Sequence, residues 1–573
     1  MMSLRSARNK PLSSNFINYL PIASIILFVL TLSSLSITEF PADPLYYVKS
    51  LPYYYWAGIC ITLASILIPL WFKIPSHEYF RILSLIMLGF YVYGTPVLAS
   101  EIPRFQDIFI HGAGVPSIIS TGLIDPTHRY ASEHPNAFVF MSMSVIVQNI
   151  GAFEYFKFIE LIIMLSLILL IYYIARFFNP AYAAIGPLAF IGVYWVDQGH
   201  FSPQGIAIVL YLIFFLSMIK AIATTKNNRN WLILTILMLV AINLTSPTNS
   251  FFLLINLLTI PAVGYVISRQ RKIPNRIVII AFICAVIFTG WSTYNAESRT
   301  ILKAEVFGDE IEEKLGSVDS TKITRTPDKT YLFVNNIRMS VTISVIASGV
   351  ILSFILMRNK SKLDHVIMLA GWFAIAYLII VSFYISTFLL ARHFMYTVFP
   401  WAIVVAFFLA YGKQSRWYKG IKLFLLFSIV AFTILIPVTR YGREPTTYVP
   451  ASLVNSGELL AEKSTESNIV AYGMSASVTK YLNAIVGGDI EVRRYHLFFE
   501  KVFEEDETYK VEDWIRREAT DMDDKIIFSE TEKNIIALKY SEAELYETFE
   551  NNVRTTDNLL INNGDARVYS RID

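Results

Sequence analysis

The residues best suited to chemistry lie in one polar stretch of an otherwise apolar first half, 101–136 (EIPRFQDIFIHGAGVPSIISTGLIDPTHRYASEHPN). Asp107 and His111 are four residues apart, so a helix here would place both on one face, with Arg104 about one turn earlier. The apolar residues between them favour an amphipathic helix along a membrane surface. A carboxylate beside an imidazole suits proton abstraction. A salt-bridged interfacial helix without catalytic function explains the same pattern.

Polar residues also stand at the ends of apolar runs farther along the chain. In the stretch DQGHFSPQ (197–204), Ser202-Pro203 is typical of a helix N-cap and first helical position. The stretch therefore either caps a helix or lines a substrate cleft. Arg392-His393 separates two long apolar runs. Its guanidinium either snorkels to a lipid headgroup or provides a two-pronged donor for a substrate phosphate.

The composition assigns these groups to a membrane protein. Hydrophobic residues make up 54% of the 573 residues, charged residues make up 16%, and the mean hydropathy is +0.49. A water-soluble globular domain of this size does not combine these values. The net charge is only +3, and Lys and Arg occur in short clusters between apolar runs, which argues against nucleic-acid binding. Cys60 and Cys284 lie within apolar runs and predict no disulfide framework.

Apolar runs long enough to cross a bilayer recur along the first 440 residues. They predict a mainly α-helical, polytopic bundle with about 13 net crossings. Within 136–177 the short run 136–150 is predicted to be a broken or partly inserted helix paired with 155–177, so that this region crosses once. The other predicted spans are 16–36, 56–72, 82–100, 181–198, 202–220, 231–246, 250–267, 277–294, 336–357, 366–389, 394–411 and 421–439.

Basic clusters orient these spans, because Lys and Arg in short loops favour the cytoplasmic side. They predict a cytoplasmic N-terminus in a plasma membrane, with loops 101–135 and 296–335 outside. Asp43, which follows the first span, is also predicted to lie outside. The clusters lie in 5–10, 220–229, 269–276, 358–362 and 413–422.

The chain becomes charged and mixed from about Arg440. This change predicts a transmembrane domain over 1–440 and a small extracytoplasmic α/β domain over 441–573, which is long enough for one core. Asn563-Gly564 is a strong signal for a two-residue hairpin turn. Strands are predicted at 469–473, 490–495 and 525–530, helices at 477–487 and 542–551, and a hairpin at 559–571.

Several motifs that would indicate other chemistry do not occur in the sequence. These are the Walker motif, G-x-G-x-x-G after a strand, C-x-x-C, H-E-x-x-H and G-x-S-x-G. Nucleotide-driven transport and zinc chemistry therefore lose support. Asp107 has no adjacent acidic partner, which weakens any metal assignment, and no residue is assigned as a metal ligand. A divalent cation is left open as a cofactor.

The arrangement resembles the GT-C superfamily of integral-membrane glycosyltransferases. The resemblance rests on the early external acid in RFQDIFIHGAG, on His134-Pro135 opening a short helix, and on the span-end Arg392. A soluble C-terminal domain ending in NNGDARVYSR adds to it, as do YIARFF (173–178) and HFSPQGIAIVLYL (200–212). The C-terminal domain lacks a WWDYG-like motif, so the oligosaccharyltransferase branch is disfavoured.

The resemblance implies a membrane glycosyltransferase that moves a sugar from a polyprenyl-phosphate-linked donor to a glycan, lipid or protein acceptor outside the cytoplasm. Asp107 would be the base of an inverting reaction, with His111 beside it. Cations would stabilise the leaving phosphate. Asp43 is the alternative early acid, because family members usually carry this acid soon after the first span. The implied substrate-binding residues are Arg104, His134, His200, Gln204, Arg299, Arg338, Arg392 and His393.

Two other classes of membrane protein remain as alternatives. A secondary transporter would show internal repeats and ionisable residues near the bilayer midplane. The sequence shows no repeat, and Glu160 is the chief charge within a span. A catalytically inactive or ligase-type protein of cell-surface polysaccharide assembly would share the same layout.

Overall fold

The structure is a computed structural model of the whole chain. The residues it describes are 14–35, 43–72, 74, 77–125, 128–196, 199–223, 228–267, 275–294, 328–357, 363–376, 387–411, 416–442, 448–463, 469–472, 478, 481–482, 492–495, 525–529, 533–534, 547, 550–551, 554, 557–562 and 566–571. Every structural statement below concerns these residues.

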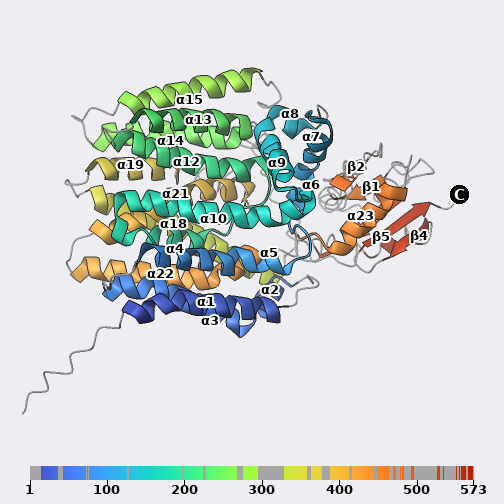
Figure 1. The fold of residues 1–573 in the computed structure, drawn as a ribbon, viewed down its shortest axis with the longest axis horizontal. Helices are drawn as coiled ribbons and strands as arrows, with labels where there is room; N and C mark the ends of the chain where they lie inside the picture. Colours follow the sequence, from blue (N-terminus) through green and yellow to red (C-terminus); the bar gives the residue numbers. More distant parts are fainter. Residues whose placement is uncertain are drawn as a thin grey trace, which may run out of the picture.

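The first 440 residues form a bundle of long helices that run side by side (Figure 1). Within the part of the chain that the structure describes, nine helical segments are long and apolar enough to cross a membrane, and five further apolar helices are shorter. The bundle helices are α1 (Ser14–Ser34), α3 (Tyr53–Phe72), α4 (Glu78–Gly89), α5 (Thr95–Ala99), α10 (Ala152–Phe178), α11 (Ile185–Val193), α12 (Pro203–Ala223), α13 (Asn228–Thr245), α14 (Pro247–Ile267), α15 (Asn275–Tyr294), α18 (Lys329–Met357), α19 (Leu363–Phe373), α21 (Thr387–Tyr411) and α22 (Arg416–Tyr441).

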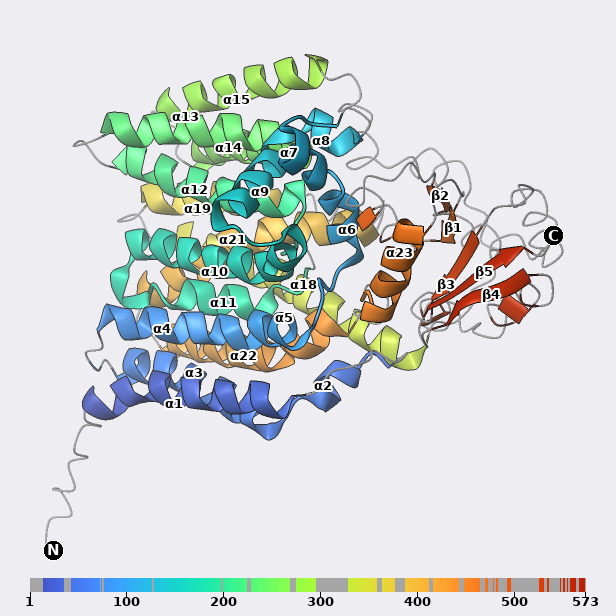
Figure 2. The ribbon, with the colours of Figure 1, turned by 45° about the vertical axis from the view of Figure 1, so that its right-hand side comes forward.

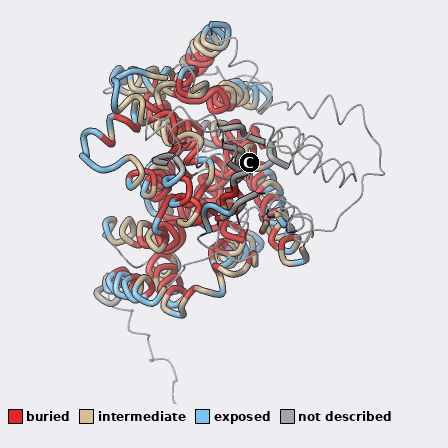
Figure 3. Tube along the Cα trace, turned by 90° about the vertical axis from the view of Figure 1, so that its right-hand side faces the viewer, coloured by how far each residue is buried: buried red, intermediate tan, exposed pale blue. Residues whose placement is uncertain are grey.

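The exterior of the bundle is apolar, as in a multi-pass membrane protein. On α22, for example, Phe424 and Phe427 are 68% and 70% exposed. In water this exposure would be costly, whereas lipid tails accommodate it. The buried positions gather toward the interior of the bundle (Figure 3). The predicted helical membrane bundle is therefore confirmed.

A π-helical turn, η1 (Phe90–Gly94), separates α4 from α5 within the predicted span 82–100. Pro96 has no backbone N–H to donate and would clash with a regular helical turn before it. The wider turn accommodates this change, and the segment 78–99 stays continuous enough to count as one apolar span.

The prediction of a long span at 181–198 is wrong. The helix there, α11, has nine residues, about 14 Å at 1.5 Å per residue, too short to cross a bilayer core alone. Every residue of α11 is buried. Its apolar composition therefore reflects packing inside the bundle and not contact with lipid.

The C-terminal end of the predicted external loop 296–335 is helical. Helix α18 begins at Lys329, because Asp328 caps it: its Oδ1 accepts from the N–H groups of Thr330 (2.8 Å) and Tyr331 (3.0 Å). Hydropathy misses this start because the first helical turns are polar. Residues 295–327 of the loop lie outside the described residues.

Four short helices gather at the end of the bundle that faces the C-terminal strands (Figures 1 and 2). The predicted short helix after His134 is confirmed, and it ends at Asn149, whose φ of 52° is the left-handed conformation of a helix C-cap. The four helices are α6 (Gln106–Gly112), α7 (Val115–Thr121), α8 (Arg129–Glu133) and α9 (Pro135–Gln148).

After Tyr441 the chain forms a helix and a five-stranded mixed sheet in the order β2-β1-β3-β5-β4. Strand β1 is parallel to β2 and β3, whereas β5 is antiparallel to β3 and β4. All predicted strands occur, and the predicted hairpin is the β4–β5 pair, although its turn, 563–565, lies outside the described residues. The elements are α23 (Ala451–Lys463), β1 (Ile469–Tyr472), β2 (Val492–Tyr495), β3 (Lys525–Ser529), β4 (Asp557–Asn562) and β5 (Ala566–Arg571).

Candidate active site

Helix α6 carries both residues that the sequence predicted to act together. Asp107 lies in its first turn and His111 in its last. The apolar face of the helix packs into the protein, since Ile108 and Phe109 are buried. The predicted amphipathic helix is thus present, with the carboxylate side directed away from its buried face.

The nearest described partner of Asp107 is His200, which lies just before α12. The His200 Nε2 is 3.6 Å from Asp107 Oδ2, longer than a hydrogen bond, so the interaction is mainly electrostatic. The His200 side chain is only 3% exposed and lies against the ring of Phe105, with 5.4 Å between ring centroids. The Ser202 Oγ accepts from the N–H of Gly205 (3.0 Å), which is the predicted N-cap of α12.

The Asp107 carboxylate is accessible and ionised. Its side chain is 51% exposed, yet protein atoms surround it closely enough for desolvation to act on its charge. Burial raises the pKa of Asp107, but interactions with His200 and Arg392 outweigh this effect and hold the pKa well below its usual value. A side chain with both properties suits a position that lines a recess open to a substrate.

His111 and Arg392 complete the electrostatic surroundings of Asp107. Burial lowers the pKa of His111 to about 3, although the charge of Asp107 opposes this shift. The imidazole is therefore neutral at physiological pH. Arg392, near the start of α21, is half-buried, and its charge acts on both Asp107 and His111. Ionisable side chains from α6, α21 and the segment before α12 thus influence one another electrostatically.

Residues at the start of α8 also contact α6, and the sequence analysis had assigned them no role. The His128 Nδ1 accepts from the N–H of Ala131 (3.1 Å), so its Nε2 carries the proton and donates to the Ile110 carbonyl (3.3 Å). The ring of Tyr130 lies edge-on to that of His111, 5.2 Å away. The polar character of 128–130 was visible in the sequence, whereas these partners were not.

Three predicted substrate-binding residues are buried near this end of the bundle. His134 is fully buried, and burial lowers its pKa to about 4. Gln204 is 8% exposed in the first turn of α12. His393 follows Arg392 on α21 and packs against Phe252, with 5.0 Å between ring centroids.

Two arginines that were predicted to bind substrate have other described surroundings. The Arg104 guanidinium lies over the rings of Tyr441 (5.2 Å) and Tyr47 (5.8 Å). Arg338 of α18 donates to the Thr439 and Arg440 carbonyls at the C-terminal end of α22. The Arg104 contacts are cation–π interactions, and the Arg338 hydrogen bonds stabilise the C-terminal end of α22. Arg299, the third, lies outside the described residues.

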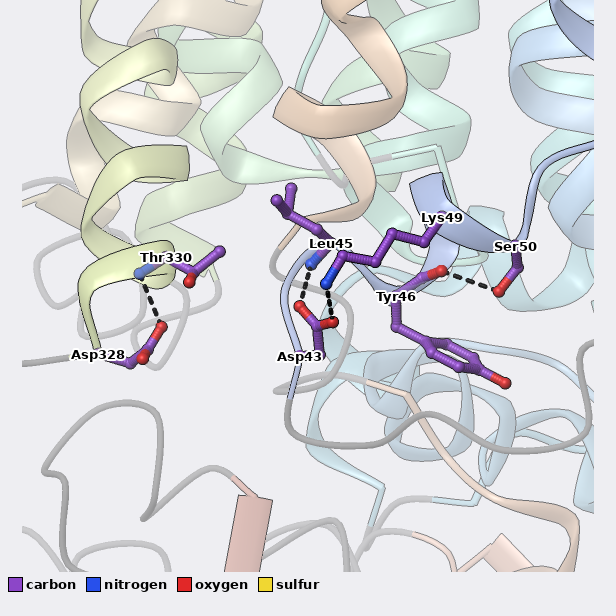
Figure 4. Close-up of polar contacts among 7 residues, drawn as sticks. All are labelled: Asp43, Leu45, Tyr46, Lys49, Ser50, Asp328 and Thr330. Carbon is purple, nitrogen blue, oxygen red and sulfur yellow. Dashed lines mark hydrogen bonds and ion pairs between the residues drawn. The ribbon is translucent and has the colours of Figure 1, made fainter.

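Asp43, the alternative early acid, has the surroundings of a turn residue (Figure 4). Its Oδ1 accepts from the Leu45 N–H (2.9 Å) and its Oδ2 from Lys49 Nζ (2.5 Å), at the start of α2 (Tyr46–Ser50). Burial raises the pKa of Asp43, but its bonds to Lys49 and Leu45 lower it overall. Both carboxylate oxygens are therefore engaged locally.

A buried ion pair inside the bundle escaped the sequence analysis. The Arg440 Nη2 lies 2.5 Å from Glu160 Oε1, and its Nη1 donates to the Val196 carbonyl. The side chains are 0% and 3% exposed. Glu160 had stood out as a charge within a span, but no sequence signal paired it with a residue so distant. In the described residues no group of three or more His, Cys, Asp or Glu side chains could hold a metal ion.

These features define the chain as a polytopic membrane protein whose candidate site lies at the bundle end next to a small C-terminal sheet. No protein-family model matches the chain. No curated protein sequence matches it either. Solved structures do match in fold, and they are membrane glycosyltransferases of the GT-C superfamily. The predicted resemblance to that superfamily is confirmed at the level of the fold.

The matching structures with a TM-score above 0.5 include the following three. The oligosaccharyltransferase of Archaeoglobus fulgidus in its apo form has a TM-score of 0.55 at 10% identity, covering 88% of this chain and 75% of that one. The oligosaccharyltransferase AglB from Archaeoglobus fulgidus, in complex with an inhibitory peptide and a dolichol-phosphate, gives 0.53 at 10% identity, covering 88% of this chain and 75% of that one. ArnT from Cupriavidus metallidurans bound to undecaprenyl phosphate gives 0.51 at 11% identity, covering 86% and 98%.

Proposed function

We propose that this protein is a glycosyltransferase that moves a sugar from a polyprenyl-phosphate-linked donor to an acceptor at the extracytoplasmic face of the membrane. The observation that carries the proposal is an accessible, ionised Asp107, 3.6 Å from His200 and under the electrostatic influence of Arg392, in a helical bundle whose fold is similar to that of GT-C enzymes. The two similar structures that contain undecaprenyl phosphate and dolichol-phosphate support the choice of donor class.

In the proposed reaction, an acceptor hydroxyl oxygen attacks the anomeric carbon of the donor sugar. The acceptor proton passes to Asp107 as the new carbon–oxygen bond forms. The bond from the anomeric carbon to the phosphate oxygen breaks, and its electron pair leaves with the polyprenyl phosphate. Attack opposite the leaving group inverts the anomeric configuration.

Arg392 is assigned to the leaving phosphate, because a guanidinium can donate two parallel hydrogen bonds to the oxygens on which negative charge develops. The interaction with His200, whose Nε2 lies 3.6 Å from Asp107 Oδ2, lowers the pKa of Asp107, and we assign His200 to holding the carboxylate in place. The lowered pKa makes Asp107 a weak base. We therefore assign it mainly to orienting and polarising the hydroxyl, with proton transfer completed late in the reaction.

The ion pair between Glu160 and Arg440 weighs against a transporter. Glu160 was the main feature within a span that favoured one, and its carboxylate is neutralised by a fully buried guanidinium. An ionisable group held in this way is poorly suited to load and release an ion during transport.

The test uses the full-length protein in lipid nanodiscs. It is given a panel of polyprenyl-phosphate sugars radiolabelled in the sugar, together with glycan, lipid and peptide acceptors in turn. The proposal expects labelled product and free polyprenyl phosphate in equal amounts, with inverted anomeric configuration by NMR. The Asp107→Asn variant is the background control. Carriage of labelled sugar across a liposome membrane, with the donor bond intact, would overturn the proposal.

A further inference from the structure

We infer that Tyr481 and the segment 448–449 are positioning elements through which the C-terminal region holds the helix that carries Asp107. The inference rests on the proposed function, in which Asp107 is the base. Two contacts between the C-terminal region and α6 support it, one on each side of the helix.

The first contact precedes α6. Phe105 and Tyr448 form an isolated antiparallel β-bridge, and the Val449 N–H donates to the Arg104 carbonyl (3.1 Å). Tyr448 and Val449 are 7% and 0% exposed, so these backbone groups are shielded from water. The bridge fixes the backbone two residues before Asp107.

The second contact lies on the other end of α6. The Tyr481 ring lies edge-on to that of Phe109, with 5.6 Å between centroids, and 6.0 Å from that of Phe156 on α10. Tyr481 is fully buried. Gly112, the last residue of α6, allows this approach, because a Cβ there would lie 3.1 Å from Tyr481 Cε2 and 2.8 Å from Phe156 Cε2. Any larger residue would force these rings apart.

A helix as short as α6, with seven residues, has little stability of its own. Its position therefore depends on tertiary contacts, and two of these come from residues after the bundle. The 3.6 Å distance between His200 Nε2 and Asp107 Oδ2 is kept only if α6 does not move relative to the start of α12. A displacement of about 1 Å at a reacting group can cost about 10²-fold in rate.

The Tyr481 hydroxyl provides a conservative variant. It is buried and has no hydrogen-bond partner among the described residues, so its loss should leave the packing unchanged. Tyr481→Phe keeps the ring against Phe109 and Gly112, whereas Tyr481→Ala removes it. Tyr569 on β5 is a matched control, because it is also buried and belongs to the sheet, where its hydroxyl donates to Glu550 (2.9 Å).

The first arm measures transfer by the full-length variants. We expect Tyr481→Ala to lower kcat by about 10²-fold with little change in KM for the donor, Tyr481→Phe to restore kcat, and Tyr569→Ala to lower the Tm without this loss. If Tyr481→Ala and Tyr569→Ala lower kcat equally, the C-terminal region acts only through stability and the inference fails.

The second arm does not require transfer activity. Asp107→Cys is introduced where Cys60 and Cys284 are replaced by Ser, and its alkylation by a water-soluble maleimide is timed. Adding Tyr481→Ala should change the alkylation rate, whereas Tyr481→Phe and Tyr569→Ala should not. An unchanged rate in Tyr481→Ala overturns the inference. A changed rate without transfer by the parent protein leaves the positioning supported and rejects the proposed function alone.

Discussion

The His200 Nε2 lies 3.6 Å from the Asp107 Oδ2, and this contact joins the segment before α12 to a helix in the polar stretch 101–136. Asp107 is the accessible partner and His200 the buried one. The carboxylate is thus the group of the pair that a substrate can reach. The imidazole contacts it from the protein interior. This asymmetry is why we assign the reacting role to Asp107 and the supporting role to His200.

Asp107→Asn should abolish most transfer, whereas Asp43→Asn should not. The amide keeps the size of the side chain but accepts no proton, and loss of a general base typically costs about 10²–10⁴-fold in rate. Asp43 is engaged by Leu45 and Lys49, so its variant should alter the α2 turn and the yield of folded protein. Turnover is measured at matched protein level, with thermal unfolding as a folding control. A dead but folded Asp43→Asn beside an active Asp107→Asn would move the base to Asp43.

Arg392→Lys should lower transfer severely if the guanidinium holds the donor phosphate. A single ammonium cannot donate two parallel hydrogen bonds to the phosphate oxygens. Arg338→Lys is the comparison, because Arg338 contacts helix carbonyls and should change Tm more than turnover. Binding of polyprenyl phosphate is measured by native mass spectrometry for both variants. Normal turnover and binding in Arg392→Lys would indicate an arginine that only snorkels to lipid.

Acid should destabilise the folded protein through its buried histidines. The pKa values of His111 and His134 are lowered from 6.5 to about 3 and about 4. Between 6.5 and these values the unfolded chain binds more protons than the folded chain, so the free energy of unfolding falls as pH falls. His134→Gln should flatten the dependence of Tm on pH in this window. The exposed His77→Gln serves as the control, and an equal effect of both variants would refute the assignment.

Asp107 itself should not produce an acid limb in the rate near neutral pH. Its pKa is held below the usual value, so the carboxylate stays ionised from neutral pH down to mildly acidic pH. His200→Asn removes a group that lowers this pKa, which should move an acid limb upward in the profile of kcat/KM. Profiles of the parent and the variant are compared over the pH range in which both stay folded. Identical profiles would show that His200 does not control the charge of Asp107.

The Glu160–Arg440 pair should show the energetics of a buried salt bridge. Glu160→Gln leaves the guanidinium without a counter-charge, which typically costs about 3–5 kcal/mol of unfolding free energy. The double variant Glu160→Leu/Arg440→Met should recover much of this loss, because it leaves no uncompensated charge. Thermal unfolding in detergent measures both. A double variant as unstable as the sum of the single variants would show that the two residues do not interact.

The sequence predicted the bundle well, because apolar runs long enough to span a bilayer are a strong physical signal. It failed where that signal has another cause. Helix α11 is apolar because it is buried in protein, and the start of α18 is polar although helical. Hydropathy measures transfer into an apolar medium, and it does not distinguish lipid from the interior of a protein.

The candidate site was predictable only in part. The spacing of Asp107 and His111 was enough to place them on one helix, since that relationship is local. The proximity of His200 and Arg392 to Asp107, and of Tyr481 to Gly112, depends on how distant elements pack. The residue types alone suggested roles for Arg104 and Arg338, whose described contacts are with aromatic rings and helix carbonyls.

The pairing of Arg440 with Glu160 has a consequence for how the protein is made. The two residues are 280 positions apart, and Arg440 belongs to the last helix of the bundle. During synthesis, α10 therefore enters the membrane long before its counter-charge leaves the ribosome. An unpaired carboxylate within a membrane-spanning helix is energetically costly. The nascent bundle must therefore keep Glu160 protonated, hydrated or shielded until α22 is inserted. Chains that terminate before residue 440 should consequently be substrates for membrane quality control.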